Sequence, residues 1–284
     1  MYIVSGATGN TGSVVAKTLL GRGLPVRVIV RSQEKGAAFE KLGAEIAVAD
    51  LHDAGALTEA LQGGTVLYLM NPPNYQSEDQ FEELEKVIAA FQTAIKNSAL
   101  EKIVVLSSIG GHLSSGTGNI LTAHKLEQAF GELEIPVTFV RAGSFMENWN
   151  SVLETAKTEG VLPSFYQPLD RKLPQIAAAD IGRVVAEAMQ EKTTGVEIKE
   201  LAGFWTSPEE TAQAAGKILG REIKAVAVPE EQWIEILSHH NSPRNAESLA
   251  EMFAGFNSGH IKFETENQIA GKITVEEYLR EALK

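Results

Sequence analysis

The stretch Tyr2-Ile3-Val4-Ser5-Gly6-Ala7-Thr8-Gly9-Asn10-Thr11-Gly12 decides the fold. A short β-branched run leads directly into glycines spaced G-x-x-G-x-x-G, and an amphipathic segment follows over residues 11–22. In order, these glycines permit a sharp turn off the strand, close approach of the backbone to a phosphate, and tight packing of the helix on the sheet. Amides at the start of the helix then point at the anion. The pattern predicts a dinucleotide-binding turn, and the alternative is a tight turn that binds nothing.

Further β-branched runs alternate with amphipathic segments through the first 145 residues. Most runs are continuously apolar, as expected of parallel strands that are covered on both faces. The alternation predicts βαβ units in an α/β, Rossmann-type doubly wound parallel sheet, which binds ligands at the carboxyl ends of its strands. The predicted strands are Tyr2–Ser5, Val26–Arg31, Ile46–Ala49, Val66–Met70, Ile103–Ser107 and Val137–Arg141.

The character of the sequence changes after Phe145, with three prolines between residues 160 and 175. A further strand is predicted at Val196–Leu201. We expect residues 1–150, plus about 176–200, to form the dinucleotide-binding Rossmann domain. Residues from about 151 to 175 and from 201 to 284 would form a smaller C-terminal α+β substrate-binding lobe over the carboxyl edge of the sheet. Capping boxes are predicted at Ser77–Gln80, Ser207–Glu210 and Thr274–Glu277.

The composition is that of an ordinary soluble globular protein, with 284 residues of which 44% are hydrophobic. The formal charge of −12 repels polyanions, so nucleic acid and anionic membrane surfaces are poor partners. The absence of cysteine excludes disulfides and thiolate zinc sites. His239 and His240 lack a third ligand at suitable spacing, so no metal site is expected. No apolar run approaches about 18 residues and the start does not resemble a signal peptide, so we expect a cytoplasmic protein.

The second predicted strand ends at Arg31. An acidic residue there would bind a free ribose 2′-hydroxyl, whereas a forked cation suits a 2′-phosphate. Arg31 therefore favours NADP(H) over NAD(H), and the alternative is a solvated arginine on a turn. The third strand ends at Asp50-Leu51, a position that lies beside the adenine in relatives of this fold. Alternatively, Asp50 caps the next helix.

Later motifs follow in a fixed order, and with the glycine spacing they resemble the NmrA-like branch of the atypical short-chain dehydrogenases/reductases. They are Val104-Val105-Leu106-Ser107-Ser108, Lys125-Leu126-Glu127, Ile135-Pro136-Val137-Thr138-Phe139-Val140-Arg141 and Gly143-Ser144-Phe145-Met146-Glu147-Asn148. The resemblance covers residues 1–150 well and the C-terminal lobe loosely. The family includes quinone reductases, phenylpropanoid reductases and cofactor-sensing regulators without known catalysis.

One departure from the wider superfamily bears on the chemistry. Many members use Tyr-x-x-x-Lys, in which the tyrosine donates a proton and the lysine holds the nicotinamide ribose. Here Lys125 occupies the lysine position, and Leu121 stands where the tyrosine would be. The resemblance implies that Lys125 holds the ribose, and the alternative is a surface lysine paired with an acidic neighbour. Residues that could supply the proton instead are His124, Ser108, His112 and Tyr75.

The missing acid narrows the plausible reaction. Hydride delivery to an aliphatic ketone makes an alkoxide, whose conjugate acid has a pKa like that of water, about 15.7. Such a product needs a positioned proton donor. A quinone gives a phenolate-like oxyanion, for which a pKa near ~10 is expected. We therefore expect an NADP(H)-dependent oxidoreductase that transfers hydride to a quinone or similar conjugated small molecule. An NADP(H)-sensing regulator with a protein partner, and an epimerase-like or aryl-ether reductase activity, stay open.

These inferences define a predicted site. The residues predicted to hold the cofactor are Gly6, Ala7, Thr8, Gly9, Asn10, Thr11, Gly12, Arg31, Asp50, Leu51, Met70, Asn71, Pro72, Ser107, Lys125, Gly143, Ser144 and Phe145. Lys125 is the candidate catalytic residue. The residues predicted to contact the hydride acceptor are Tyr75, Gly110, His112, Phe145 and Met146. Alternatively, the loop after Met70 is only a rigid connection, and Phe145 and Met146 pack at the lobe junction. Asp180 is predicted to cap a helix rather than to act in catalysis.

Overall fold

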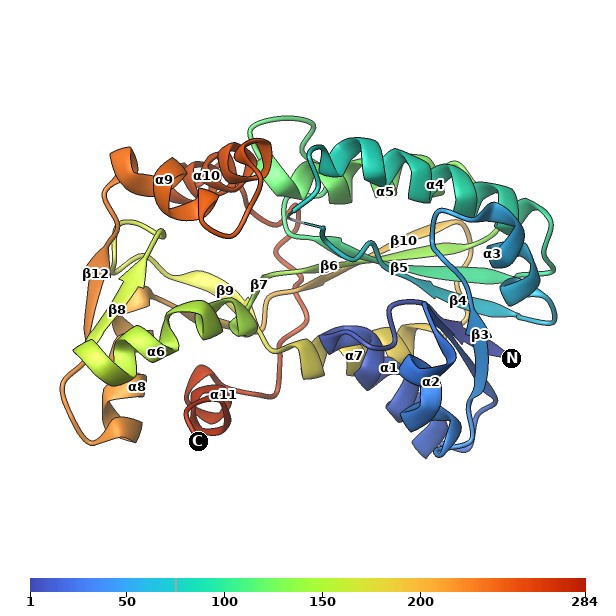
Figure 1. The fold of residues 1–284 in the computed structure, drawn as a ribbon, viewed down its shortest axis with the longest axis horizontal. Coiled ribbons are helices and arrows are strands. Elements are labelled where there is room, and N and C mark those ends of the chain that lie inside the picture. Colours follow the sequence, from blue (N-terminus) through green and yellow to red (C-terminus); the bar gives the residue numbers. More distant parts are fainter. Residues whose placement is uncertain (75) are drawn as a thin grey trace.

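The computed structural model describes residues 1–74 and 76–284, and a seven-stranded parallel sheet lies at its centre (Figure 1). The strand order is β10-β6-β5-β4-β1-β2-β3, so the chain begins in the middle of the sheet and winds outward in both directions. The Rossmann-type α/β fold predicted from the alternation is confirmed. The strands are β1 (Tyr2–Val4), β2 (Val26–Val30), β3 (Glu45–Val48), β4 (Val66–Leu69), β5 (Lys102–Ser108), β6 (Val137–Ala142) and β10 (Val196–Leu201).

Helices cover both faces of this sheet (Figure 1). One layer contains α1 (Asn10–Gly21), α2 (Gln33–Glu40) and α7 (Ala178–Ala188). The other contains α3 (Ala54–Leu61), α4 (Gln80–Lys96) and α5 (Leu121–Gly131). Each layer buries its own hydrophobic core against the strands. Because both faces of the inner strands are buried, those strands need apolar residues at successive positions, and this makes their runs recognisable in the sequence. The edge strands β3 and β10 are partly exposed and less uniformly apolar.

A smaller group of elements lies beyond the carboxyl edge of the sheet (Figure 1, left). Among the described residues it contains a three-stranded sheet, β11-β9-β7, and a two-stranded parallel sheet, β12-β8. Buried aromatic rings such as Trp149 and Tyr166 fill its core, with ring centroids 6.2 Å apart. The strands are β7 (Ser144–Phe145), β8 (Val161–Ser164), β9 (Leu173–Ile176), β11 (Phe204–Thr206) and β12 (Lys224–Ala227). The helices are η2 (Met146–Trp149), α6 (Asn150–Glu159), α8 (Pro208–Leu219), η3 (Glu230–Gln232), α9 (Trp233–Ser238), α10 (Pro243–Ser258) and α11 (Val275–Ala282), and η1 (Gly118–Ile120) precedes α5.

Two of the predicted capping boxes are confirmed. Ser207 and Glu210 open α8, and Thr274 and Glu277 open α11, with the side-chain and backbone bonds reciprocal in each. These boxes could be predicted because the hydroxyl and the carboxylate, three residues apart, accept hydrogen bonds from two amides that have no acceptor within the helix. The motif therefore needs no contact with the rest of the chain.

The capping box predicted at Ser77 is wrong. The N-cap of α4 is Asp79, whose carboxylate accepts hydrogen bonds from the amides of Phe81 and Glu82 at 2.9 and 3.2 Å. An ionised carboxylate at a helix N-terminus also interacts favourably with the helix dipole, so Asp79 is the better cap. Gln80 is buried instead and donates to Asn119 Oδ1 at 2.5 Å.

The prediction that Asp180 caps a helix is also wrong. The N-cap of α7 is Ala177, and Asp180 lies in the first turn. Asp180 Oδ2 instead accepts hydrogen bonds from the amides of Lys272 and Ile273 at 2.6 and 2.9 Å. The buried carboxylate therefore fastens a distant part of the chain to the start of α7.

Residues 261–273, which we name the C-terminal strap, return from the smaller lobe to the carboxyl edge of the sheet. Ile269 forms an isolated parallel bridge with Leu201 at the end of β10, and its carbonyl accepts from the amide of Ala202 at 3.1 Å. Ile261, at the start of the strap, is buried in the core of the smaller lobe. No helix among the described residues is long and apolar enough to cross a membrane.

Candidate active site

The glycine loop joins β1 to α1 at the centre of the sheet. Gly6 has φ +63°, and a Cβ built there would lie 2.6 Å from Met70 Sδ. A Cβ at Gly12 would lie 2.3 Å from the carbonyl oxygen of Gly6. The left-handed backbone at Gly6 and the backbone contact at Gly12 therefore require glycine at both positions, even without a ligand. Gly9 differs, because it is exposed and its Cβ would approach only the Gly6 oxygen, at 3.3 Å. A bare backbone at Gly9 leaves the outer side of the loop open to a ligand.

The start of α1 is suited to an anion. Its N-cap is Gly9, and among the described residues no side chain caps it. The amides of Asn10, Thr11 and Gly12 have no intrahelical acceptor. The first turn carries no acidic side chain, whereas carboxylates cap α3 and α4 directly. The free amides and the positive end of the helix dipole meet at exposed backbone, which is the environment that a pyrophosphate needs.

Neighbouring elements hold this loop in place. A Cβ at Gly182 of α7 would lie 2.5 Å from Val14 Cβ and 2.8 Å from the carbonyl oxygen of Thr11, so the two helices touch closely. The Thr11 hydroxyl lies 3.1 Å from the Tyr68 hydroxyl of β4. Burial raises the pKa of Tyr68 well above its ordinary value, so the phenol stays neutral and acts as an internal support. The sequence analysis missed Tyr68, because its run of apolar neighbours marked it only as core.

Arg31 and Asp50 follow neighbouring strands, β2 and β3. Arg31 is exposed, and in the described part of the chain its guanidinium makes no hydrogen bond or ion pair. Asp50 accepts from the backbone amide of His52 at 2.9 Å and lies 2.8 Å from its ring Nδ1. These bonds, with a smaller contribution from Arg31, lower the pKa of Asp50. Asp50 does not cap the following helix, because Asp53 does so.

The loop after β4 begins beside the glycine loop. The Met70 amide donates to Ser5 Oγ at 3.2 Å, and the Met70 thioether is the group that any side chain at Gly6 would strike. Asn71 is half-buried and Pro72 is exposed. Tyr75, predicted to contact the acceptor, lies outside the described residues.

The next predicted residues lie at the end of β5 and in the turn that follows it. The Ser107 hydroxyl donates to Glu127 Oε1 at 2.5 Å, so this side chain is committed to the protein interior. Gly110 has φ +79°, and a Cβ there would lie 3.2 Å from Ile261 of the C-terminal strap. His112 is half-buried, and its Nδ1 has no hydrogen-bond partner among residues 1–74 and 76–284.

Lys125 lies on α5 and points to a neighbouring helix. Its Nζ is 2.9 Å from Glu85 Oε1 of α4, and both side chains are partly exposed. This pairing agrees with the alternative of a surface ion pair, although the partner differs from the neighbours on its own helix. Leu121 lies one turn earlier and lines a shallow groove of about 310 Å³ together with Phe81 and Thr117. Contact between Lys125 and the cofactor stays a prediction.

The loop after β6 connects the sheet to the smaller lobe. The Gly143 amide donates to the Leu201 carbonyl at 2.9 Å, and the Ser144 hydroxyl lies 3.0 Å from the Tyr166 hydroxyl. Met146 is fully buried in the core of the smaller lobe, and this agrees with the packing alternative. The half-buried Phe145 packs against the core of the main sheet.

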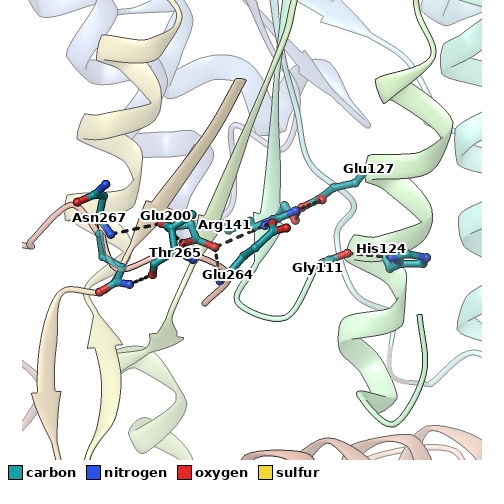
Figure 2. Close-up of polar contacts among 10 residues, drawn as sticks. Gly111, His124, Glu127, Arg141, Glu200, Glu264, Thr265 and Asn267 are labelled. Carbon is teal, nitrogen blue, oxygen red and sulfur yellow. Dashed lines mark hydrogen bonds and ion pairs between the residues drawn. The ribbon is translucent and has the colours of Figure 1, made fainter. Parts of the chain in front are cut away.

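A buried ionic cluster, which the sequence analysis missed, lies at the same edge of the sheet (Figure 2). Arg141, at the end of β6, binds both oxygens of Glu127, with Nε 2.9 Å from Oε1 and Nη2 2.7 Å from Oε2. Its Nη1 lies 3.4 Å from Glu200 Oε1 and 2.6 Å from Glu264 Oε2. Burial lowers the pKa of Arg141, but the carboxylates of Glu127 and Glu264 more than reverse this, so the guanidinium stays charged.

A hollow of about 610 Å³ lies elsewhere, at the start of α4. Its lining has two basic residues, Lys86 and Arg244, but four acidic ones, so its net negative charge would repel a phosphate-bearing cofactor. The acidic residues are Glu78, Asp79, Glu82 and Glu83. No group of three potential metal ligands occurs among the described residues. Most of the predicted site residues therefore lie at the carboxyl edge of the sheet and not at this hollow.

The comparison with known families decides the relationship. A model of the NmrA-like family matches residues 2–279. The chain belongs to the NmrA-like family. The resemblance inferred from the motifs of the first 150 residues is thereby confirmed, and the match extends through the C-terminal lobe as well.

Relatives of this NmrA-like protein include named reductases. It is 27% identical to an NAD(P)H azoreductase from Xenophilus azovorans, over 89% of this chain and 86% of the relative. It is 26% identical to quinone oxidoreductase 2 from Escherichia coli, over 92% of this chain and 88% of the relative.

Solved structures share the fold. An NADPH-dependent quinone oxidoreductase from Escherichia coli, complexed with NADPH, superimposes with a TM-score of 0.84 and 23% identity over 100% of both chains. The negative transcriptional regulator NmrA superimposes with a TM-score of 0.75 and 18% identity, over 99% of this chain and 94% of that chain. Enzymes and a regulator therefore share this architecture, so function must be argued from the site.

Proposed function

We propose that this NmrA-like protein is an NADP(H)-dependent oxidoreductase that transfers hydride to a quinone or a similar conjugated small molecule. The observation that carries the proposal is the uncapped start of α1, which presents free amides behind the exposed backbone of Gly9. The named reductases among its relatives, an azoreductase and a quinone oxidoreductase, support the reaction class.

The residues present fit a phosphorylated dinucleotide. The glycine loop would hold the pyrophosphate, and Arg31, whose guanidinium has no bonded partner in the described chain, would bind the 2′-phosphate. Asp50 and Leu51 would flank the adenine. The loop from Met70 to Pro72 and the turns after β5 and β6 would border the nicotinamide, at the carboxyl edge where open α/β sheets bind ligands. When bound, NADPH supplies the hydride.

The chain's own residues favour an acceptor whose product is a weakly basic oxyanion. Leu121 cannot donate a proton, and burial raises the pKa of Tyr68, which makes its phenol a weaker proton donor than an ordinary tyrosine. Reduction of a quinone needs no strong positioned acid, because the product oxyanion resembles a phenolate. Lys125 could release Glu85 and bind the ribose, since an exposed ion pair of this kind contributes only about 0–1 kcal/mol.

An NADP(H)-sensing regulator is the second candidate function. Two observations favour it, because they leave the usual catalytic positions without a catalytic group. Leu121 cannot donate a proton, and Lys125 is paired with Glu85. The two candidates share the cofactor and differ in turnover.

Steady-state oxidation of NADPH with a panel of benzoquinones, naphthoquinones and azo dyes tests the proposal, with an aliphatic ketone as the control acceptor. We expect turnover with at least one conjugated acceptor and none with the ketone. A thermal shift with NADPH provides the binding measurement. If NADPH stabilises the protein but no acceptor is reduced, the sensor hypothesis replaces the enzyme hypothesis. If NADPH neither stabilises the protein nor is oxidised, the proposed cofactor site is wrong.

A further inference from the structure

Side chains of α5 clamp the turn that follows β5. Glu127 Oε1 accepts the Ser107 hydroxyl at 2.5 Å, and one turn earlier His124 Nδ1 lies 2.9 Å from the Gly111 carbonyl oxygen (Figure 2). The contact is also close at Gly111, because a Cβ there would lie 2.5 Å from Glu127 Oε1 and 2.7 Å from Ser107 Oγ. The turn therefore rests directly on the Glu127 carboxylate.

Arg141 fixes that carboxylate from the other side. Two parallel N–H···O bonds join the guanidinium to Glu127, a geometry that fixes the plane and the position of the carboxylate. Glu127 and Arg141 are both nearly buried, with side-chain exposures of 11% and 5%. Low exposure strengthens these bonds and removes competition from water.

We propose that Glu127 is a positioning residue for the reduction: held by Arg141, it fixes the turn from Ser108 to Gly111 against which the acceptor binds. The inference rests on the proposed function, because Gly110 in this turn and His112 directly after it are the residues assigned to the acceptor. Glu127 touches neither cofactor nor acceptor in this assignment. It acts through Ser107 and the backbone of the turn.

The substitution Glu127→Gln separates this role from folding. A glutamine can still accept the Ser107 hydroxyl with its carbonyl oxygen, but its amide N–H₂ would face the donors of Arg141. The guanidinium keeps Glu200 and Glu264 as partners, so no unpaired buried charge is left. We therefore expect a folded protein in which the turn is loosened.

Kinetics and hydrogen exchange of this variant test the proposal. We expect kcat/KM for the quinone to fall roughly ten- to a hundredfold, the scale of a misplaced binding surface. The Kd for NADPH, measured by fluorescence titration, should change less than about threefold, because the glycine loop and Arg31 are untouched. Amide exchange in residues 108–113 should accelerate, while exchange in residues 6–12 stays unchanged.

Two further variants serve as controls. Glu132→Gln, at an exposed position that caps the same helix, should change none of these measurements. Ser107→Ala removes the hydroxyl through which Glu127 acts, so it should reproduce the kinetic defect, and the double variant should be no worse than either single one.

The outcomes separate the two proposals. Unchanged exchange in residues 108–113, or equal losses in NADPH affinity and quinone turnover, would overturn the role of Glu127. If the wild-type protein oxidises no NADPH, the proposed function fails on its own. The exchange measurement then still decides whether Glu127 holds the turn.

Discussion

Gly12 and Gly21 lie on the same helix, but their surroundings differ completely. A Cβ at Gly12 would lie 2.3 Å from the Gly6 oxygen, whereas one at Gly21 would meet no atom within 4 Å. We expect Gly12→Ala to destabilise the protein by about 1–3 kcal/mol through overpacking and to weaken NADPH binding. Gly21→Ala should stabilise it by up to about 1 kcal/mol through helix propensity. Urea unfolding of both variants is the measurement, and equal stabilities would contradict the close contact at Gly12.

Arg31 is the residue on which cofactor preference depends. We expect Arg31→Asp to weaken NADPH binding by about 1.5–3 kcal/mol, the range for a hydrogen bond to a charged group, and to change NADH binding much less. Calorimetric titration of both cofactors measures the difference. Equal losses for NADPH and NADH would show that Arg31 does not contact the 2′-phosphate.

Lys86 is a suitable control residue for testing the role of Lys125. Each is partly exposed and paired with a glutamate, but only Lys125 occupies the lysine position of the Tyr-x-x-x-Lys motif described above. We expect Lys125→Ala to lower kcat or NADPH affinity at least several-fold, while both alanine variants change stability by no more than about 1 kcal/mol. Steady-state assays and thermal unfolding are the measurements. Identical behaviour of the two variants would leave Lys125 as a surface residue.

Among single residues, the sequence allowed predictions for those whose expected role depends on their neighbours in the chain. The glycine loop and Arg31 follow directly from strand and turn positions. The cluster around Arg141 did not emerge, because its partners Glu127, Glu200 and Glu264 come from distant parts of the chain. A signal was present: Arg141 and Glu200 are opposite charges near the ends of two predicted strands, and those strands pair side by side.

At the scale of elements, the C-terminal strap depends on few anchors. Asp180 holds it through the amides of Lys272 and Ile273, and a Cβ at Gly271 would lie 2.7 Å from Asp180 Oδ2. We expect Asp180→Ala to cost about 1–3 kcal/mol, because two backbone amides lose their hydrogen bonds to a buried carboxylate.

Limited proteolysis tests this expectation. The Asp180→Ala variant should be cleaved within residues 261–273 faster than the wild type. Glu187→Ala, at a partly exposed position of the same helix, is the control and should leave the cleavage pattern unchanged. Equal cleavage of all three proteins would show that the strap does not depend on Asp180.

Elements that bury two faces or carry their own caps were predictable, and elements fixed by distant contacts were not. The strands of the main sheet and the starts of α8 and α11 belong to the first kind. The start of α4 was misplaced because Ser77 and Asp79 both offer capping oxygens, and the choice between them depends on where Gln80 packs. The strap belongs to the second kind, since its bonds reach Asp180 and Glu200.

At the scale of the whole molecule, stability should depend on pH through the carboxylates that bind the strap. Burial would raise the pKa of Glu200, but the amides of Glu264 and Thr265, the Thr265 hydroxyl and Arg141 lower it overall below its ordinary value of 4.5. The unfolded chain then binds this proton more readily than the folded one, so this contribution to stability is lost as the pH falls below about 4.5.

Urea unfolding from about pH 7 down to about pH 3.5 measures this effect. We expect the wild type to lose stability in the acid range and Glu200→Gln to be less stable at neutral pH, with a shallower acid decline. Glu134→Gln, at an exposed position, should follow the wild type. Parallel curves for wild type and Glu200→Gln would show that Glu200 does not contribute.

The position of β10 beside β6 affects how chimeras of this fold can be built. The chain leaves the sheet after β6, builds β8, β9 and α6, and comes back to complete the sheet before leaving again. Specificity therefore cannot be transplanted between homologues by a single crossover point. A single splice after β6 would import β10 together with the smaller lobe, and the foreign β10 would have to pair with the native β6. Further splices on either side of β10 would keep the native β6–β10 pair in the chimera.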